Sequence, residues 1–129
     1  MNIPSGSVAA DPSFSPDTRQ IAFVTAKDLG PKVYLDSKEK LDSWNDTRTL
    51  WVTNTDGSGG RPLTHAGKYI QDPQWSRDGK YIMYISKDGL WIIDAQGNER
   101  HQILGPFPEA EYYLGFYGMG SYVLAWYQG

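Results

Sequence analysis

The sequence predicts an all-β fold made of repeated four-stranded antiparallel units. The chain has 129 residues, which suits one domain. Its apolar runs are short and rich in β-branched and aromatic residues, as in 81–85 and 90–93. Such runs are typical of strands covered on both faces rather than of helices. Pairs such as Asp88-Gly89 separate the runs and favour tight hairpins.

A repeat runs through the chain. Residues 11–23 resemble residues 72–84, with Asp-Pro, Ser and Asp at matching positions and an offset of 61 residues. Residues 50–52 (Leu-Trp-Val) resemble residues 90–92 (Leu-Trp-Ile) at an offset of 40 residues. The two offsets differ by 21 residues, so the first unit carries an insertion of that size. A period of about 40 residues with four strands predicts β-propeller blades.

The first unit accounts for four strands and the insertion. Its strands are expected near 12–15, 19–25, 49–54 and 60–63. Pro12 suits the start of a strand, where a missing backbone N–H is tolerated. The insertion at 27–47 lies between the second and third strands, and its residues 37–44 are expected to form a short helical turn. Thr18 stands where the second unit has Gly79, and a β-branched residue resists positive φ, so we expect a different turn type there.

The second unit has no insertion, and a third copy is incomplete. Strands of the second unit are expected near 73–76, 80–86, 89–94 and 99–104. The third copy supplies two strands, near 113–117 and 121–127. We therefore predict one partial propeller domain over residues 1–129, in which two four-stranded antiparallel blades (about 11–64 and 72–104) are followed by a half blade (about 113–127). An irregular β-sandwich is the structural alternative.

These motifs resemble the repeat of TolB-like β-propellers. The best copy is 72–93, which reads Asp-Pro-x-Trp-Ser-x-Asp-Gly-Lys and then Leu-Trp-Ile-Ile, while 61–64 ends the first unit with Leu-Thr. The similarity covers roughly 11–104 outside the insertion and, weakly, 113–127. It implies bladed propellers that are often extracytoplasmic and that bind proteins or sit beside a catalytic domain.

Composition excludes several classes of function. Lys and Arg number 12 against 15 Asp and Glu, and the resulting charge of −3 argues against a nucleic-acid binder. There is no cysteine, so disulfides and thiolate chemistry are excluded. No apolar run is long enough for membrane insertion, and no signal peptide is visible in 1–10. Localisation stays open between the cytoplasm and the periplasmic or secreted setting that the resemblance implies.

Catalytic and metal-binding motifs are weak. No Gly-x-Ser-x-Gly elbow is present, and the Ser37-x-x-Lys40 pair lies in a charged insertion where chance explains it. His65 and His101 occupy non-equivalent positions of the repeat, whereas a metal site needs convergent ligands. We therefore expect no enzymatic activity, no metal and no cofactor in this chain.

A protein-binding loop face is the functional prediction. In a four-stranded meander the insertion and the connections between blades emerge on the same face, so the insertion should lie beside 65–70 and 105–112. Loops on a rigid scaffold are favoured binding sites, and aromatic residues anchor interfaces. The candidate binding residues are Tyr34, Trp44, His65, Tyr69 and Tyr112. A charged surface loop without a ligand is the competing interpretation.

The number of strands raises a problem of closure. Propellers typically close with four to eight blades, so two and a half blades leave apolar faces open. We therefore expect either self-association through the exposed blade faces or a chain that is cut from a longer propeller. The alternative functions are the propeller portion of a larger enzyme, of peptidase or lyase type, and a truncated fragment whose role belongs to a longer protein.

Overall fold

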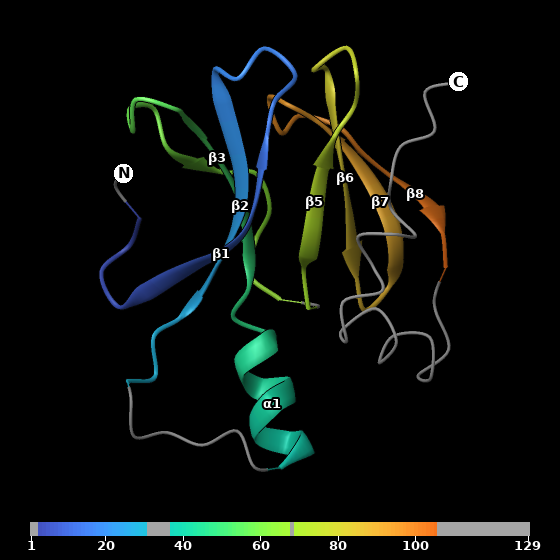
Figure 1. Cartoon of the computed structure of the whole chain (residues 1–129). Coiled ribbons are helices and arrows are strands. Elements are labelled where there is room, and N and C mark those ends of the chain that lie inside the picture. The colour runs from blue at the N-terminus through green and yellow to red at the C-terminus, as the bar shows by residue number, and fades with distance from the viewer. Residues whose placement is uncertain (1–2, 31–36, 68, 106–129) are drawn as a thin grey trace.

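The computed structural model describes residues 3–30, 37–67 and 69–105, which form two four-stranded antiparallel sheets and one helix (Figure 1). The first sheet, blade 1, contains in order β1 (Ser7–Phe14), β2 (Gln20–Lys27), β3 (Thr49–Asn54) and β4 (Arg61–Pro62). The second sheet, blade 2, contains in order β5 (Gln71–Trp75), β6 (Tyr81–Ser86), β7 (Gly89–Asp94) and β8 (Arg100–Leu104). Helix α1 (Lys38–Asn45) lies between β2 and β3, and no described helix is long and apolar enough to cross a membrane.

The predicted strands are present, and the all-β fold class is confirmed. β3 and β7 begin and end where the repeat places them, at 49–54 and 89–94. The largest difference is at β1, which starts at Ser7 rather than near residue 12 because its first residues pair with the end of β2 ahead of a bulge. The half blade predicted at 113–127 lies outside the described residues.

The prediction of a different turn at Thr18 was wrong. Thr18 has a φ of 61° and Gly79 a φ of 72°, so both adopt the left-handed conformation. In blade 1 the Ser15 hydroxyl donates to the Asp17 carboxylate at 2.6 Å, and the equivalent serine and aspartate of blade 2 repeat this bond at the same distance. The Asp17 carboxylate also accepts from the backbone N–H of Arg19 at 3.0 Å. This network fixes the turn, and threonine is held in a conformation that it disfavours.

The main core lies between the facing sides of the two blades, which stand side by side in Figure 1. Alternate residues of β2, β3, β6 and β7 point into it, as expected for a pleated sheet. Blade 1 contributes Ala22, Val24, Leu50 and Val52, and blade 2 contributes Trp75, Ile82, Tyr84 and Ile93. The Trp75 indole N–H also donates to the Ser13 carbonyl oxygen at 2.9 Å, which joins β5 to β1.

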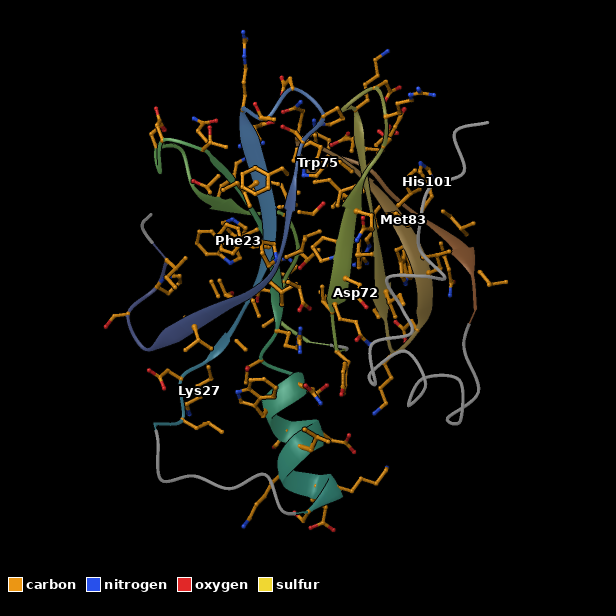
Figure 2. The ribbon with its side chains drawn as sticks, viewed as in Figure 1. Phe23, Lys27, Asp72, Trp75, Met83 and His101 are labelled. Carbon is orange, nitrogen blue, oxygen red and sulfur yellow. The ribbon has the colours of Figure 1, made fainter. Side chains whose placement is uncertain are left out.

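The two blades are apolar on their far sides as well. The rings of Phe23 and Trp51 pack together in blade 1 with centroids 6.3 Å apart, and both side chains are buried. Met83 and Ile85 form a separate cluster in blade 2, with Leu90 packed against it. Figure 2 shows the side chains of Phe23, Met83 and Trp75 on the two sheets. Apolar residues on both faces are what strands stacked between neighbouring blades require.

Candidate functional site

The candidate site is the end of the two blades from which α1 projects, here called the helix-side face. Its described residues are 28–30 and 37–48 between β2 and β3, 63–67 and 69–70 between β4 and β5, and the turn 87–88. The sequence predicted that the insertion would lie beside 65–70, and the structure confirms it. The backbone N–H of Gly67 donates to the Arg48 carbonyl oxygen at 3.0 Å. Of the other predicted neighbour, 105–112, only Gly105 is described.

Local sequence explains why α1 forms. Ser37 caps the helix, since its hydroxyl accepts a hydrogen bond from the Lys40 N–H at 3.2 Å. Glu39 places a negative charge in the first turn, where the helix dipole favours it. Lys38 and Asp42 are one turn apart, and their charged groups lie 3.4 Å from each other. The helix predicted at 37–44 is therefore confirmed and is shifted by one residue, to 38–45.

Two hydrogen bonds attach the end of the insertion to β2, and a third lies within the insertion. The Trp44 indole N–H donates to the Lys27 carbonyl oxygen at 2.8 Å. The Lys27 N–H donates to the Thr47 hydroxyl oxygen at 3.0 Å, and that hydroxyl donates to the Trp44 carbonyl oxygen at 2.6 Å. Figure 2 shows Lys27 at the end of β2, close to the helix. These bonds fix the insertion to the blade at its C-terminal end.

Arg48 connects the C-terminal end of the insertion to β1. Its side chain is buried, and its guanidinium Nη2 lies 2.7 Å from the Asp11 carboxylate. The guanidinium also lies 5.8 Å from the ring of Trp44 and 5.9 Å from that of Tyr69. The backbone N–H of Asp72 donates to Asp11 at 3.4 Å. Burial raises the pKa of the Asp72 carboxyl, the charge of Asp11 raises it further, and Arg48 opposes the rise.

Two hollows open on the helix-side face. The first, the inter-blade pocket, has a volume of about 180 Å³. It is lined by His65, Ala66, Gly67, Ile70, Tyr84, Ser86, Asp88, Trp91 and Arg100. The second, the blade 1 groove, has a volume of about 650 Å³ and is lined by residues 4–7, 25–28, 47, 49, 51, 62 and 64–66. His65 and Ala66 line both hollows and form the wall between them.

The inter-blade pocket combines polar groups with the aromatic rings of Trp91 and Tyr84. The Arg100 guanidinium carbon lies 4.6 Å from the centroid of the Trp91 ring. The Tyr84 side chain is buried, and its hydroxyl has no hydrogen-bond partner among the described residues. Burial raises the pKa of the Tyr84 phenol, the Arg100 guanidinium opposes the rise, and the Asp88 charge adds to it.

The predicted binding residues occupy different environments. His65 is exposed at the wall between the hollows. Trp44 is half-buried and Tyr69 is buried, and Arg48 brings their rings together. Tyr34 and Tyr112 lie outside the described residues. Trp44 and Tyr69 therefore support the face from within, whereas His65 is available at its surface.

Sequence reasoning missed the residues of the inter-blade pocket. Trp91 was recognised only as part of a strand, and Arg100 was not singled out. The hairpin register could have found them, because Arg100 pairs with Ile93, two residues from Trp91 on the neighbouring strand. Within the described parts of the chain, no group of three or more His, Asp or Glu residues is placed to hold a metal ion.

Comparison with known proteins places these blades among propellers. No family model matches the sequence. The chain is 30% identical to the uncharacterized peptidase YuxL of Bacillus subtilis (strain 168) over 98 residues, which cover 72% of this chain and 13% of that protein. It is 36% identical over 55 residues to the Tol-Pal system protein TolB of Wolbachia pipientis subsp. Culex pipiens (strain wPip), covering 43% of this chain and 13% of that protein.

Solved structures agree with these matches. An oligogalacturonate lyase from Vibrio parahaemolyticus aligns with a TM-score of 0.64 at 13% identity, over 84% of this chain and 31% of that one. An oligogalacturonate lyase in complex with manganese gives 0.62 at 11% identity, over 80% of this chain and 30% of that one. A protein assigned as TolB from Agrobacterium tumefaciens gives 0.51 at 18% identity, over 81% and 31%.

The chain has the TolB-like β-propeller fold. Its two described sheets are blades of that fold, as the sequence motifs indicated, and they correspond to about 30% of the solved propeller chains. The chain spans only 13% of the length of each of the two curated relatives. Each of the two blades has apolar residues on the side away from the shared core, as strands stacked between neighbouring blades require.

Proposed function

We propose that the chain is part of a non-catalytic propeller module that binds a protein partner through the helix-side face. One observation carries the proposal. A helix that is fixed to the blade stands beside an exposed wall, His65-Ala66, with a hollow on either side of it. Convex and concave elements next to one another form a surface that can match another folded protein.

The rigidity of this face supports binding. The Trp44 indole and the Thr47 hydroxyl tie the insertion to β2, and the buried Arg48 ties it to β1. Association costs less free energy when the binding elements are already ordered before the partner arrives. A connection that was only a solvated charged loop would not require a buried, paired arginine at its base.

The chemistry of the face fits a protein partner. The exposed side of α1 carries Lys38, Glu39, Lys40 and Ser43, which suits the polar rim of an interface. The blade 1 groove contains Trp51, and the inter-blade pocket contains Trp91. Tryptophan is enriched among the residues that dominate binding energy. The polar helix and the two aromatic hollows thus supply a rim and anchoring points.

Affinity capture from an extract of the source organism tests the proposal. Lys40→Glu reverses a charge on α1, and Lys80→Glu makes the same change at the opposite end of the blades, where residue 80 is also exposed. We expect a partner protein that is retained by the unchanged chain and by Lys80→Glu but lost, at least tenfold, with Lys40→Glu or His65→Ala. A partner that both lysine variants retain equally would place binding elsewhere.

A second candidate is the propeller portion of a larger enzyme. The match to the peptidase YuxL, over 72% of this chain, favours it. The structural likeness to oligogalacturonate lyases makes a lyase the other enzyme type to consider. Incubation of the purified chain with a broad pool of fluorogenic peptides and with oligogalacturonate separates the candidates. We expect no turnover from the chain alone, and cleavage abolished by a single substitution in it would favour the enzyme.

We also propose self-association through open blade surfaces. Phe14 is 60% exposed at the end of β1, and Ile103 and Leu104 are 53% and 59% exposed on β8. Exposed apolar side chains on an edge strand favour pairing with a further strand. Light scattering over a range of concentrations should give a mass above 14.5 kDa that falls on dilution. A constant monomer mass would count against this association.

A further inference from the structure

The inter-blade pocket lies beside the connection that follows the short outer strand of blade 1. β4 contains only Arg61–Pro62, whereas its counterpart β8 contains five residues. Arg61 still closes the end of the blades away from α1, since its guanidinium donates to the Ala95 carbonyl oxygen at 2.8 Å. Beyond β4 no described strand of blade 1 covers the outer strands of blade 2, and the pocket opens there.

The Arg100 guanidinium and the Tyr84 hydroxyl are neighbouring hydrogen-bond donors in this pocket. The Arg100 guanidinium stacks on the Trp91 ring at 4.6 Å and lies near the Tyr84 phenol, whose pKa it lowers. The Tyr84 hydroxyl, on a side chain that is 1% exposed, has no hydrogen-bond partner among the described residues. A buried hydroxyl without a partner costs free energy, so a ligand that accepts its hydrogen bond is favoured. A carboxylate is the group that accepts from an arginine and a phenol together.

The charges around the pocket allow an anion beside Tyr84. Asp88 also lines the pocket and brings a negative charge. Arg100, which stacks on Trp91 in the same pocket, brings the opposite charge, and it lowers the pKa of the Tyr84 phenol by more than Asp88 raises it. The volume of about 180 Å³ is below the few hundred Å³ typical of small-molecule sites and suits a single side chain.

We propose that the inter-blade pocket binds the carboxylate of an acidic side chain of a protein partner. Arg100 and the Tyr84 hydroxyl hold the carboxylate, and Trp91 orients Arg100 from below. That the carboxylate belongs to a protein, rather than to a small molecule, rests on the proposed function. The pocket itself can be tested without the partner, so failure of one proposal is distinguishable from failure of the other.

Titration of the ¹⁵N-labelled full chain with N-acetyl-glutamate methylamide tests the pocket. We expect saturable shifts of the Trp91 indole N–H and the Arg100 Nε–H, with affinity at least about tenfold weaker for the matched glutamine compound. Free acetate should shift the same signals more weakly. Equal affinity for the glutamate and glutamine compounds would overturn the proposal, and acetate binding as tightly as the glutamate compound would overturn the assignment to a side chain.

Two variants and a control identify the binding groups. Arg100→Gln should weaken binding about tenfold or more, and Tyr84→Phe, which keeps the ring, should weaken it about threefold. Arg19→Gln removes an exposed arginine at the far end of blade 1 and should bind as the unchanged chain does. Thermal unfolding checks that each variant is folded. Unchanged affinity in folded Arg100→Gln would overturn the proposal, whereas capture by the α1 variants would still report on the proposed function.

Discussion

Blade 1 and blade 2 share a strand order but differ in the residues outside the repeat. Both begin with a bulged strand in which an aspartate, Asp11 or Asp72, has positive φ, and both close their first turn with a serine–aspartate bond. Blade 1 alone carries α1 and the buried Arg48, whereas blade 2 alone has a full-length outer strand. The shared residues build the sheets and contribute Trp51 and Trp91 to the two hollows, whereas the unshared residues add the helix and its anchor.

Removal of Arg48 should be the most damaging single change to blade 1. Arg48→Met leaves Asp11 partly buried without its cation and next to Asp72, so we expect a loss of about 3–5 kcal/mol. Urea unfolding measures it, and Asp11→Asn in the same chain should recover part of the loss. Arg19→Met, an exposed control, should change stability by less than about 0.5 kcal/mol. Equal effects at the two arginines would mean that Arg48 does not anchor the insertion.

A substitution at Gly89 should reveal how strongly the tight turn between β6 and β7 restricts the residue at this position. It has a φ of 136°, and a Cβ there would overlap the Leu104 carbonyl oxygen and the Gly105 Cα. We expect Gly89→Ala to cost about 2–4 kcal/mol in chemical unfolding. Blade 1 has Thr49 at the equivalent position because its longer connection removes the constraint. Thr49→Ala should therefore cost less than about 1 kcal/mol, and a similar cost at both sites would remove this distinction.

An exchange of turn residues should affect the two blades in opposite directions. Thr18→Gly relieves a β-branched residue with a φ of 61°, so it should stabilise the protein by about 0.5–1 kcal/mol. Gly79→Thr introduces the same strain in blade 2 and should destabilise it by about 1–2 kcal/mol. Thermal unfolding of both variants measures the difference. Changes of the same sign would show that the two turns are not equivalent.

The smallest expected effect is a difference between the pKa values of Asp17 and Asp78 and that of Asp72. Hydrogen bonds from a serine and from the backbone lower the pKa of Asp17 and of Asp78 below 3.8, so their stabilising contribution is present above that value and lost as pH falls. The pKa of Asp72 is raised above 3.8, so its contribution is lost as pH rises through its folded-state pKa. Carboxyl-carbon NMR titration should order Asp72 above the other two. Coincident titrations would contradict this picture.

The repeat made most of the fold predictable. Apolar strands recur at a fixed spacing outside the insertion, so β3 and β7 could be placed to the residue. The early start of β1 was not predictable, because Ser7–Ala10 are mostly polar or small and pair only in the folded sheet. The conformation of Thr18 was missed because side-chain bonds of Ser15 and Asp17 override the preference of threonine.

The site was less predictable than the fold. Proximity of the insertion to 65–70 followed from the topology, but the burial of Tyr69 depends on Arg48, which lies outside the repeat. The pocket around Trp91 and Arg100 is also lined by the connection after β4, a strand that ends after two residues although the sequence continues with apolar Leu63. Tertiary packing decides both features, and residue type alone does not encode it.

The anchoring of α1 has a mechanical consequence. Arg48 connects the base of the helix to the bulge of β1 over 2.7 Å, and Asp72 of β5 bonds to the same carboxylate. A force applied to the helix is thus transmitted to the first strands of both blades. A force that pulls on α1 would therefore act on both sheets at once through the Arg48–Asp11 ion pair.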